Sequence, residues 1–130
     1  MQMIDDNPFL LAVENGETIT VKIIQSFGMA ELVNYSLNGS GMPFPKSTPL
    51  EFTVTKNGDG TLGFAFRLGG FQPTGPNPSR LVMVLHFAGN NGGSFKVKVT
   101  GSQGGVSGYS DDQGDGEVFR TLRYTFSIPA

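Results

Sequence analysis

The sequence predicts an all-β protein, a single antiparallel β-sandwich of about seven to nine strands. Short apolar runs with a period of two recur from Phe9 to Ile128, and they are separated by breaks rich in Gly, Asn, Asp and Pro. In the segment 94–100 every second residue is apolar and the residues between are lysines, as the dry and wet faces of a strand require. No segment shows the 3.6-residue period of an amphipathic helix.

Eight segments fit strands, with ends uncertain by about two to four residues. They are 9–13, 18–24, 32–38, 50–55, 61–68, 80–88, 94–100 and 117–128. Segment 80–88 is apolar at both parities, which predicts a central strand with both faces covered. Segment 117–128 is long enough to bend or to cross between two sheets.

The inward-facing residues of these strands define a predicted core. It comprises Ile19, Val21, Ile23, Val33, Leu37, Phe52, Val54, Phe64, Phe66, Met83, Leu85, Phe95, Val97, Val99, Tyr124 and Phe126. Segments 35–39 and 93–99 resemble strands found in many immunoglobulin-like and lectin-like sandwiches. The expected fold is immunoglobulin-like or jelly-roll-like. Alternation and turn chemistry alone produce such segments, so they do not identify a family.

Size and composition limit the classes of function. The 130 residues fit one domain, residues 1–130, and the net charge of −2 gives no basic footprint for nucleic acid. Without cysteine the chain has no disulfide framework and no thiolate site. Residues 1–8 lack the pattern of a signal peptide and no run could span a bilayer, so we expect a soluble protein without a membrane span.

Three long connections, 39–49, 69–79 and 101–116, carry most of the prolines or a run of Gly and Ser. Long loops are frequent sites of function. If every consecutive strand reverses direction, connections alternate between the two ends of the sandwich, and all three long loops meet at one end. The sequence therefore predicts a binding surface there.

Phe44, Phe71 and Tyr109 are the candidate ligand-binding residues, because each is an aromatic residue in polar, Pro- or Gly-rich surroundings. Exposed rings stack on sugar faces or anchor protein partners. The alternative is that each ring folds back to close the end of the sandwich. The absence of tryptophan counts against a carbohydrate ligand.

Calcium is the one cofactor that the sequence suggests. The segment 111–117 supplies Asp111, Asp112, Asp115 and Glu117 among glycines, and hard cations take oxygen ligands of this kind. The segment lacks the full spacing of an EF-hand loop. The commoner explanation for such a segment is a solvated turn rich in Asp and Gly before the final strand.

An enzyme is not expected. His86 is the only histidine and lies in the most apolar segment, which predicts a hydrogen-bonded core residue and not a catalytic base. The chain contains no metalloprotease helix motif, phosphate-binding loop or nucleophile elbow. An enzyme whose site is assembled from distant residues without a motif is the third alternative.

Two classes of function fit these observations. The first is a non-enzymatic binding module, lectin-like in its use of loops 39–49, 69–79 and 101–116, that recognises a glycan or a protein. The second is a structural subunit that assembles with copies of itself as a homo-oligomer, or with another protein, and has no small-molecule ligand. Calcium-dependent glycan binding would favour the first, and a discrete oligomer without glycan binding would favour the second.

Overall fold

The structure is a computed structural model that describes residues 1–6, 9–26, 30–40, 51–54, 59–68, 79–89, 94–112 and 118–128. These residues form ten strands and no helix. The strands are β1 (Gln2–Asp6), β2 (Phe9–Ala12), β3 (Glu17–Ser26), β4 (Ala30–Ser40), β5 (Glu51–Val54), β6 (Asp59–Leu68), β7 (Ser79–Gly89), β8 (Ser94–Gly101), β9 (Val106–Asp112) and β10 (Val118–Ile128).

The all-β class is confirmed, and each of the eight predicted strands is present. Two strands were not predicted. β1 has five exposed side chains and therefore no alternation. In β9 the usual pattern is reversed, because Ser107 and Tyr109 face inward while Val106 is exposed.

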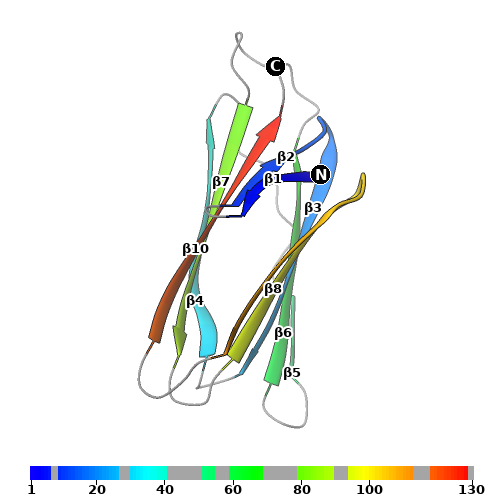
Figure 1. The fold of residues 1–130 in the computed structure, drawn as a ribbon. Helices are drawn as coiled ribbons and strands as arrows, with labels where there is room; N and C mark the ends of the chain where they lie inside the picture. Colours follow the sequence, from blue (N-terminus) through cyan, green and yellow to red (C-terminus); the bar gives the residue numbers. More distant parts are fainter. Residues whose placement is uncertain are drawn as a thin grey trace.

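The strands form two sheets that lie face to face (Figure 1). One has the order β1-β2-β10-β7-β4, and in the other β3 lies between β6 and β8, with β5 and β9 as the edges. A single residue pair, Ser26 with Ala30, links β3 to β4 and so connects the two sheets through the backbone. Packing of side chains must therefore hold the sheets together.

The sheets are mixed, so the prediction of a purely antiparallel arrangement is wrong. β2 pairs with β10 in parallel, from Phe9 opposite Tyr124 to Ala12 opposite Ser127. Eight connections separate these two strands along the chain. Since each one reverses the direction, β2 and β10 point the same way.

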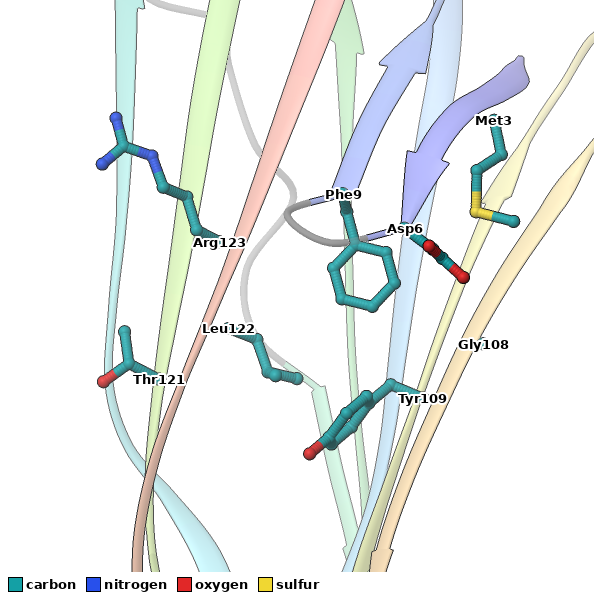
Figure 2. A pocket seen from close by; sticks show the side chains of 8 residues that line it. All are labelled: Met3, Asp6, Phe9, Gly108, Tyr109, Thr121, Leu122 and Arg123. Carbon is teal, nitrogen blue, oxygen red and sulfur yellow. The ribbon is translucent and has the colours of Figure 1, made fainter.

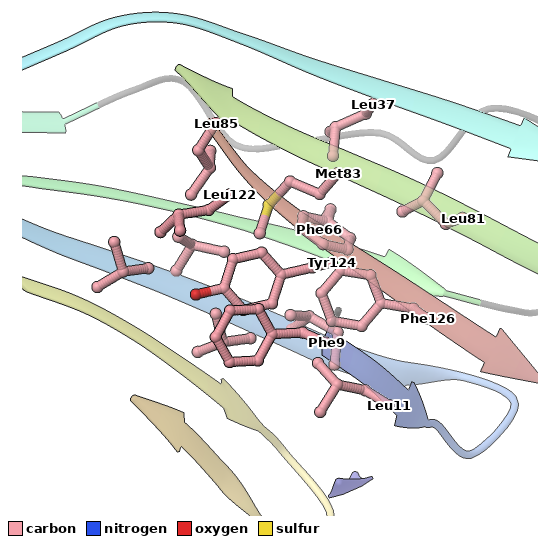
Figure 3. Close-up of a cluster of buried hydrophobic side chains, with 14 of the residues drawn as sticks. Phe9, Leu11, Leu37, Phe66, Leu81, Met83, Leu85, Leu122, Tyr124 and Phe126 are labelled. Atoms are coloured by element: carbon pink, nitrogen blue, oxygen red, sulfur yellow. The ribbon is translucent and has the colours of Figure 1, made fainter. Parts of the chain in front are cut away.

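Aromatic rings fill much of the space between the sheets (Figure 3). Phe87 of β7 stacks on Phe95 of β8 with centroids 4.0 Å apart, and Phe66 of β6 meets Phe126 of β10 edge-on at 5.5 Å. Each pair joins one sheet to the other. The predicted core is buried wherever its side chains are described, except for Val33.

Val33 was predicted to face the core but is 58% exposed. The pairing of β4 with β7 shifts register between Leu32 and Asn34, which makes Val33 the extra residue of a bulge. A bulge reverses the side-chain parity along a strand. Leu32 before it and Leu37 after it consequently both pack on the core.

β7 is central, as predicted, with β10 on one side and β4 on the other. Its second face is half-buried and belongs to the outer surface of the sheet. His86 lies on that outer face, so the prediction of a core histidine is wrong, although its ring is hydrogen-bonded. The Nδ1 atom lies 3.1 Å from Oγ1 of Thr121 on the neighbouring strand.

The segment 101–116 was predicted to be a long loop. Instead β8 turns tightly into β9, which returns along the sheet to pair Asp112 with Ser94. The acidic segment therefore starts at the end of the domain where β8 begins. Ser40 and Leu68, which precede the other two long connections, lie at the opposite end, opposite Arg80 and Glu17.

The prediction of a common binding surface assumed that connections alternate between the two ends of the sandwich. The extra strand β9 shifts this alternation by one strand, so that β9 ends at the opposite end of the domain from Ser40 and Leu68. Residues 41–50 and 69–78 lie outside the described part of the chain. Within the described part, no helix is long and apolar enough to cross a membrane.

Phe95→Ala is expected to lower the free energy of unfolding by about 3–5 kcal/mol, because it removes a fully buried ring that stacks across the two sheets. Urea denaturation measures the change. Phe119→Ala is the matched control, since Phe119 is 74% exposed and its loss should change stability by less than about 0.5 kcal/mol. Equal effects of the two substitutions would contradict the proposed role of the stacked pair.

Candidate binding cleft between strands β9 and β10

A cleft of about 500 Å³ opens at the side of the molecule between the edges of the two sheets. Its walls come from β1 and β2 above, β10 on one side and β9 on the other (Figure 2). The lining residues are Met3, Asp6, Phe9, Gly108, Tyr109, Thr121, Leu122 and Arg123. The cleft therefore reaches the layer between the sheets from the side.

Three apolar or aromatic side chains converge in the cleft (Figure 2). Phe9 meets the ring of Tyr109 edge-on, with centroids 6.3 Å apart and planes at 89°. Leu122 of β10 points toward Tyr109 of β9 across the opening. These side chains offer contact surface for one further apolar side chain.

The backbone of β10 also faces the cleft. β2 covers β10 only over residues 124–127, and no described strand pairs with residues 118–123 on that side. The carbonyl oxygen of Ser127 accepts a hydrogen bond from the N–H of Val13, so odd-numbered residues of β10 direct their backbone groups away from β7. The pairing with β7 has no register shift that would change this parity.

Thr121 and Arg123 accordingly line the cleft with their main chain. Figure 2 shows both side chains pointing away from the cleft, to the outer face of the sheet. The N–H and C=O groups of Thr121 and the N–H of Arg123 are directed to the side that β2 leaves open, whereas the register of β2 places the C=O of Arg123 opposite the N–H of Phe9. The edge of β10 is thus available for pairing with another strand.

Tyr124 stands behind the cleft, fully buried and stacked on Phe9 with centroids 4.4 Å apart. Its hydroxyl has no hydrogen-bond partner among the described residues. Burial raises the pKa of Tyr124 well above its ordinary value, and the phenol of Tyr109 adds to the rise. The hydroxyl therefore stays protonated and can donate a hydrogen bond.

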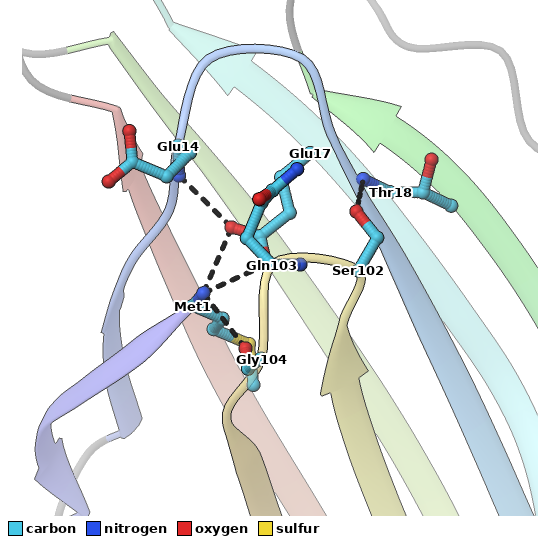
Figure 4. A network of polar contacts seen from close by, with 7 residues as sticks. All are labelled: Met1, Glu14, Glu17, Thr18, Ser102, Gln103 and Gly104. Atoms are coloured by element: carbon cyan, nitrogen blue, oxygen red, sulfur yellow. Dashed lines mark hydrogen bonds and ion pairs between the residues drawn. The ribbon is translucent and has the colours of Figure 1, made fainter.

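A buried carboxylate, that of Glu17, joins the start of β1 to the turn between β8 and β9 (Figure 4). Glu17 is fully buried and accepts hydrogen bonds from the α-amino group of Met1 at 2.8 and 3.0 Å. It also accepts the backbone N–H groups of Glu14 and Gln103, each at 3.0 Å. One side chain therefore ties β1 and β3 to the hairpin between β8 and β9.

Glycines make room for this arrangement. A Cβ at Gly101 would collide with the carboxylate of Glu17, and one at Gly105 would collide with the backbone of Met1. Gly105 also has a φ of +89°, which other residues rarely adopt. The Gly-rich stretch that suggested a loop instead encloses a buried ion pair.

The charge state of Glu17 follows from its partners. Burial alone raises the pKa of Glu17. The hydrogen bonds from the α-amino group and from the N–H groups of Glu14 and Gln103 lower the pKa, and together with the charge of the α-amino group they outweigh the effect of burial. The resulting pKa of Glu17 lies below its ordinary value, and the carboxylate is ionised at neutral pH.

The structure brings one predicted site residue, Tyr109, into this cleft, where it is half-buried in β9 and faces Phe9. Asp111 and Asp112 end the same strand, and their side chains lie outside the described part of the chain. Also outside it are Phe44, Phe71, Asp115 and Glu117. In the described residues no three His, Asp or Glu side chains form a group that could hold a metal ion.

Sequence reasoning did not identify Phe9, Leu122 or Glu17 as site residues. Phe9 and Leu122 look like ordinary core residues, because only the short reach of β2 along β10 exposes the space between them. Glu17 had one signal, its place directly before an alternating strand in a chain with few charges. Its partners are far away in sequence and could not be foreseen.

The comparisons with known proteins do not supply a function. The chain matches no protein-family model, no curated protein and no solved structure.

Tyr124→Phe is expected to raise the free energy of unfolding by about 1 kcal/mol, because it removes a buried hydroxyl that lacks a partner. Urea denaturation of the two proteins tests this. Tyr35→Phe is the control, since the side chain of Tyr35 is 38% exposed and its hydroxyl is not locked in the core. A destabilised Tyr124→Phe variant would show that the hydroxyl has a partner after all.

Glu17→Gln is expected to lower the free energy of unfolding by about 3 kcal/mol at pH 7, because it leaves a buried ammonium without its counter-charge. The folded-state pKa is lower than the unfolded one, so this stabilisation is complete above the ordinary pKa near 4.5. It is lost as the pH falls through the lower folded-state pKa.

Denaturation curves from pH 7 down to pH 3 measure this dependence. The difference between wild type and Glu17→Gln should shrink toward acid pH. Glu14→Gln is the matched control, since the Glu14 side chain is exposed and points away from the network. A difference that is constant over the whole pH range would rule out the ionised carboxylate as the stabilising group.

Proposed function

We propose that the protein is a non-enzymatic β-sandwich binding module that takes an extended segment of a protein partner as an added strand along β10. One observation carries the proposal: Thr121 and Arg123 present backbone groups, and not side chains, to an apolar cleft. Strand addition uses this combination, in which the main chain supplies affinity and pockets for alternate side chains supply specificity.

The chain's own β2 shows how such a segment would fit. β2 occupies the upper part of the same edge and inserts Phe9 and Leu11 into the space between the sheets. A segment that continues this edge over residues 118–123 would place one side chain beside Leu122 and Tyr109. An apolar residue at that position matches the lining.

The lining supports binding and not catalysis. Asp6 is the only carboxylate among the lining residues, and its neighbours are apolar, aromatic or backbone groups. A hydrolytic site needs a nucleophile within hydrogen-bonding distance of a base. The hydroxyl of Thr121 does lie 3.1 Å from Nδ1 of His86, but the Thr121 side chain points away from the cleft, to the outer face of the sheet where His86 also lies.

The strand order favours an immunoglobulin-like sandwich over a jelly roll. Immunoglobulin-type domains pair strands C, F and G in one sheet and B, E and D in the other. β4-β7-β10 and β3-β6-β5 reproduce these two orders, and the hairpin β8–β9 is an insertion between the counterparts of F and G. The resemblance concerns the fold only and does not identify the ligand.

A glycan bound by Phe44 and Phe71, and a calcium ion bound by the segment 111–117, remain separate predictions about residues outside the described part of the chain. Tyr109, the third residue of that prediction, faces the side cleft. The self-assembling alternative differs from our proposal only in the identity of the partner, since a second copy could supply the added strand.

Arg123→Pro tests the proposal, because it removes an N–H directed at the open edge and leaves the pairing with β7 in place. A displayed library of random twelve-residue peptides is selected on the wild-type protein. The selected peptides should bind Arg123→Pro at least about tenfold more weakly, while Arg123→Ala, which keeps the N–H, should bind them nearly as well as wild type.

Thermal melting first confirms that both variants are folded. Amide shifts of residues 118–123 on peptide addition then locate the binding edge. Equal binding to both variants, or shifts confined to other strands, would contradict strand addition. Light scattering without peptide shows whether a second copy takes the same place.

A further inference from the structure

The sheet that contains β3 and β8 carries a cluster of lysines on its outer face. On β3 and β8 the residues that alternate with the core residues point outward, and these include Lys22, Lys96 and Lys98. Lys22 lies directly opposite Lys98 in the pairing of the two strands, and Lys96 follows two residues before Lys98 on the same face. Three ammonium groups thus share one small area of a chain whose net charge is −2.

None of these three lysines forms an ion pair or a hydrogen bond with another described residue. Like charges directly opposite each other on neighbouring strands destabilise a sheet. The isolated protein therefore bears a cost that an external anion would relieve.

Apolar side chains and a hollow lie next to the lysines. Ile24, opposite Lys96, is 46% exposed, and Val106 on β9 is 58% exposed. Between them a shallow hollow of about 330 Å³ lies over Gly108, where a Cβ would meet no atom within 4 Å. The face therefore combines positive charge with exposed aliphatic groups.

The remaining outward residues of the same face add no described carboxylate. Arg67 on β6 contributes a further cation, whose Nε donates a hydrogen bond to the carbonyl of Gly16. By backbone register, Glu51 lies opposite Gly63, two strands from Lys22, and Asp112 lies opposite Ser94 at the end of β9. Asp59 lies opposite Ser26 at the start of β6. All three acidic positions are at the border of the lysine cluster, with Asp112 a diagonal neighbour of Lys96 across the pairing of β8 and β9.

We propose that this basic face, Lys22, Lys96 and Lys98 with Ile24 and Val106, binds the surface of an anionic lipid bilayer. Lysines are attracted to anionic headgroups, and exposed aliphatic side chains insert at the boundary with the acyl chains. Single-stranded nucleic acid would instead require exposed aromatic rings for stacking, and the one aromatic residue that lines the hollow, Tyr109, packs its ring on Phe9 and Phe95 in the layer between the sheets. The proposal is independent of the cleft.

Vesicles of about 100 nm provide the test, either of pure phosphatidylcholine or with about 30% phosphatidylserine. The wild-type protein should co-sediment with the anionic vesicles at 50 mM NaCl, should bind the neutral ones far more weakly, and should be released at 500 mM NaCl, roughly as screening predicts. Equal sedimentation with both vesicle types, or none with the anionic ones, would overturn the proposal.

Variants locate the binding face. Lys22→Ala should weaken vesicle binding about fivefold and Lys22→Ala with Lys98→Ala about 25-fold, the equivalent of about 1 kcal/mol for each lysine. Arg80→Ala is the matched control on the outer face of the other sheet, where an exposed cation is removed, and it should change binding less than twofold. Equal losses in the control would show that only net charge matters and would refute this face as the site.

A final comparison separates the lipid surface from a soluble polyanion. Ile24→Ser keeps all the charges, so it should weaken binding to anionic vesicles and leave any binding to heparin or inorganic phosphate unchanged. If Ile24→Ser binds vesicles as well as wild type, and heparin competes fully, the ligand is a soluble polyanion and the lipid proposal fails. Urea denaturation of each variant confirms that the fold is retained.

Discussion

Within the described residues the two sheets share a single backbone pair, Ser26 with Ala30, so contacts between side chains must hold these residues together. Aromatic contacts cross the gap at several points, among them Phe87 on Phe95, Phe66 on Phe126, Tyr35 on Phe64 and Phe9 on Tyr109. Because neither sheet can slide without separating these rings, the packing fixes the distance and the register of the sheets. Every surface discussed above is positioned by this layer.

The layer of side chains between the sheets is left uncovered at one side, and the cleft opens there. β2 is only four residues long and covers a third of the edge of β10, while β9 forms the facing edge of the other sheet. The side chain of Glu17 then fixes the walls around the opening by joining β1 to the turn after β8. A buried charge that is fully hydrogen-bonded gives this junction a defined geometry.

Alternation was sufficient to predict the fold class, eight strands and nearly all of the core, because a half-buried strand needs one dry face. It failed where burial does not follow hydrophobicity. β9 places Ser107 inward and Val106 outward, and β1 has no buried side chain at all. The bulge at Val33 and the parallel pairing of β2 depend on partners that local sequence does not specify.

The candidate site was harder to predict than the fold, for a related reason. Tyr109 is an aromatic residue in a Gly/Ser stretch that the sequence predicts to be a loop. Its proposed role in the cleft depends on strand β9, which this stretch forms. Phe9 and Leu122 are typical core residues. They line the cleft only because β2 pairs with residues 124–127 of β10 and no described strand covers residues 118–123 on that side. A site built from an unpaired edge consists of backbone groups, which every residue possesses, and so it leaves no motif.

Most described inward side chains of the two sheets pack in the core, which leaves the side cleft, the edges and the outer faces for recognition. The edge of β10 offers hydrogen-bonding groups beside an apolar opening, and these suit an extended chain. The outer face of β3, β8 and β9 offers separate cations on a flat, pleated surface, and these suit an extended anionic layer. The two surfaces meet at β9, where Gly108 and Tyr109 line both the cleft and the shallow hollow, so a strand bound along β10 would lie next to the basic face.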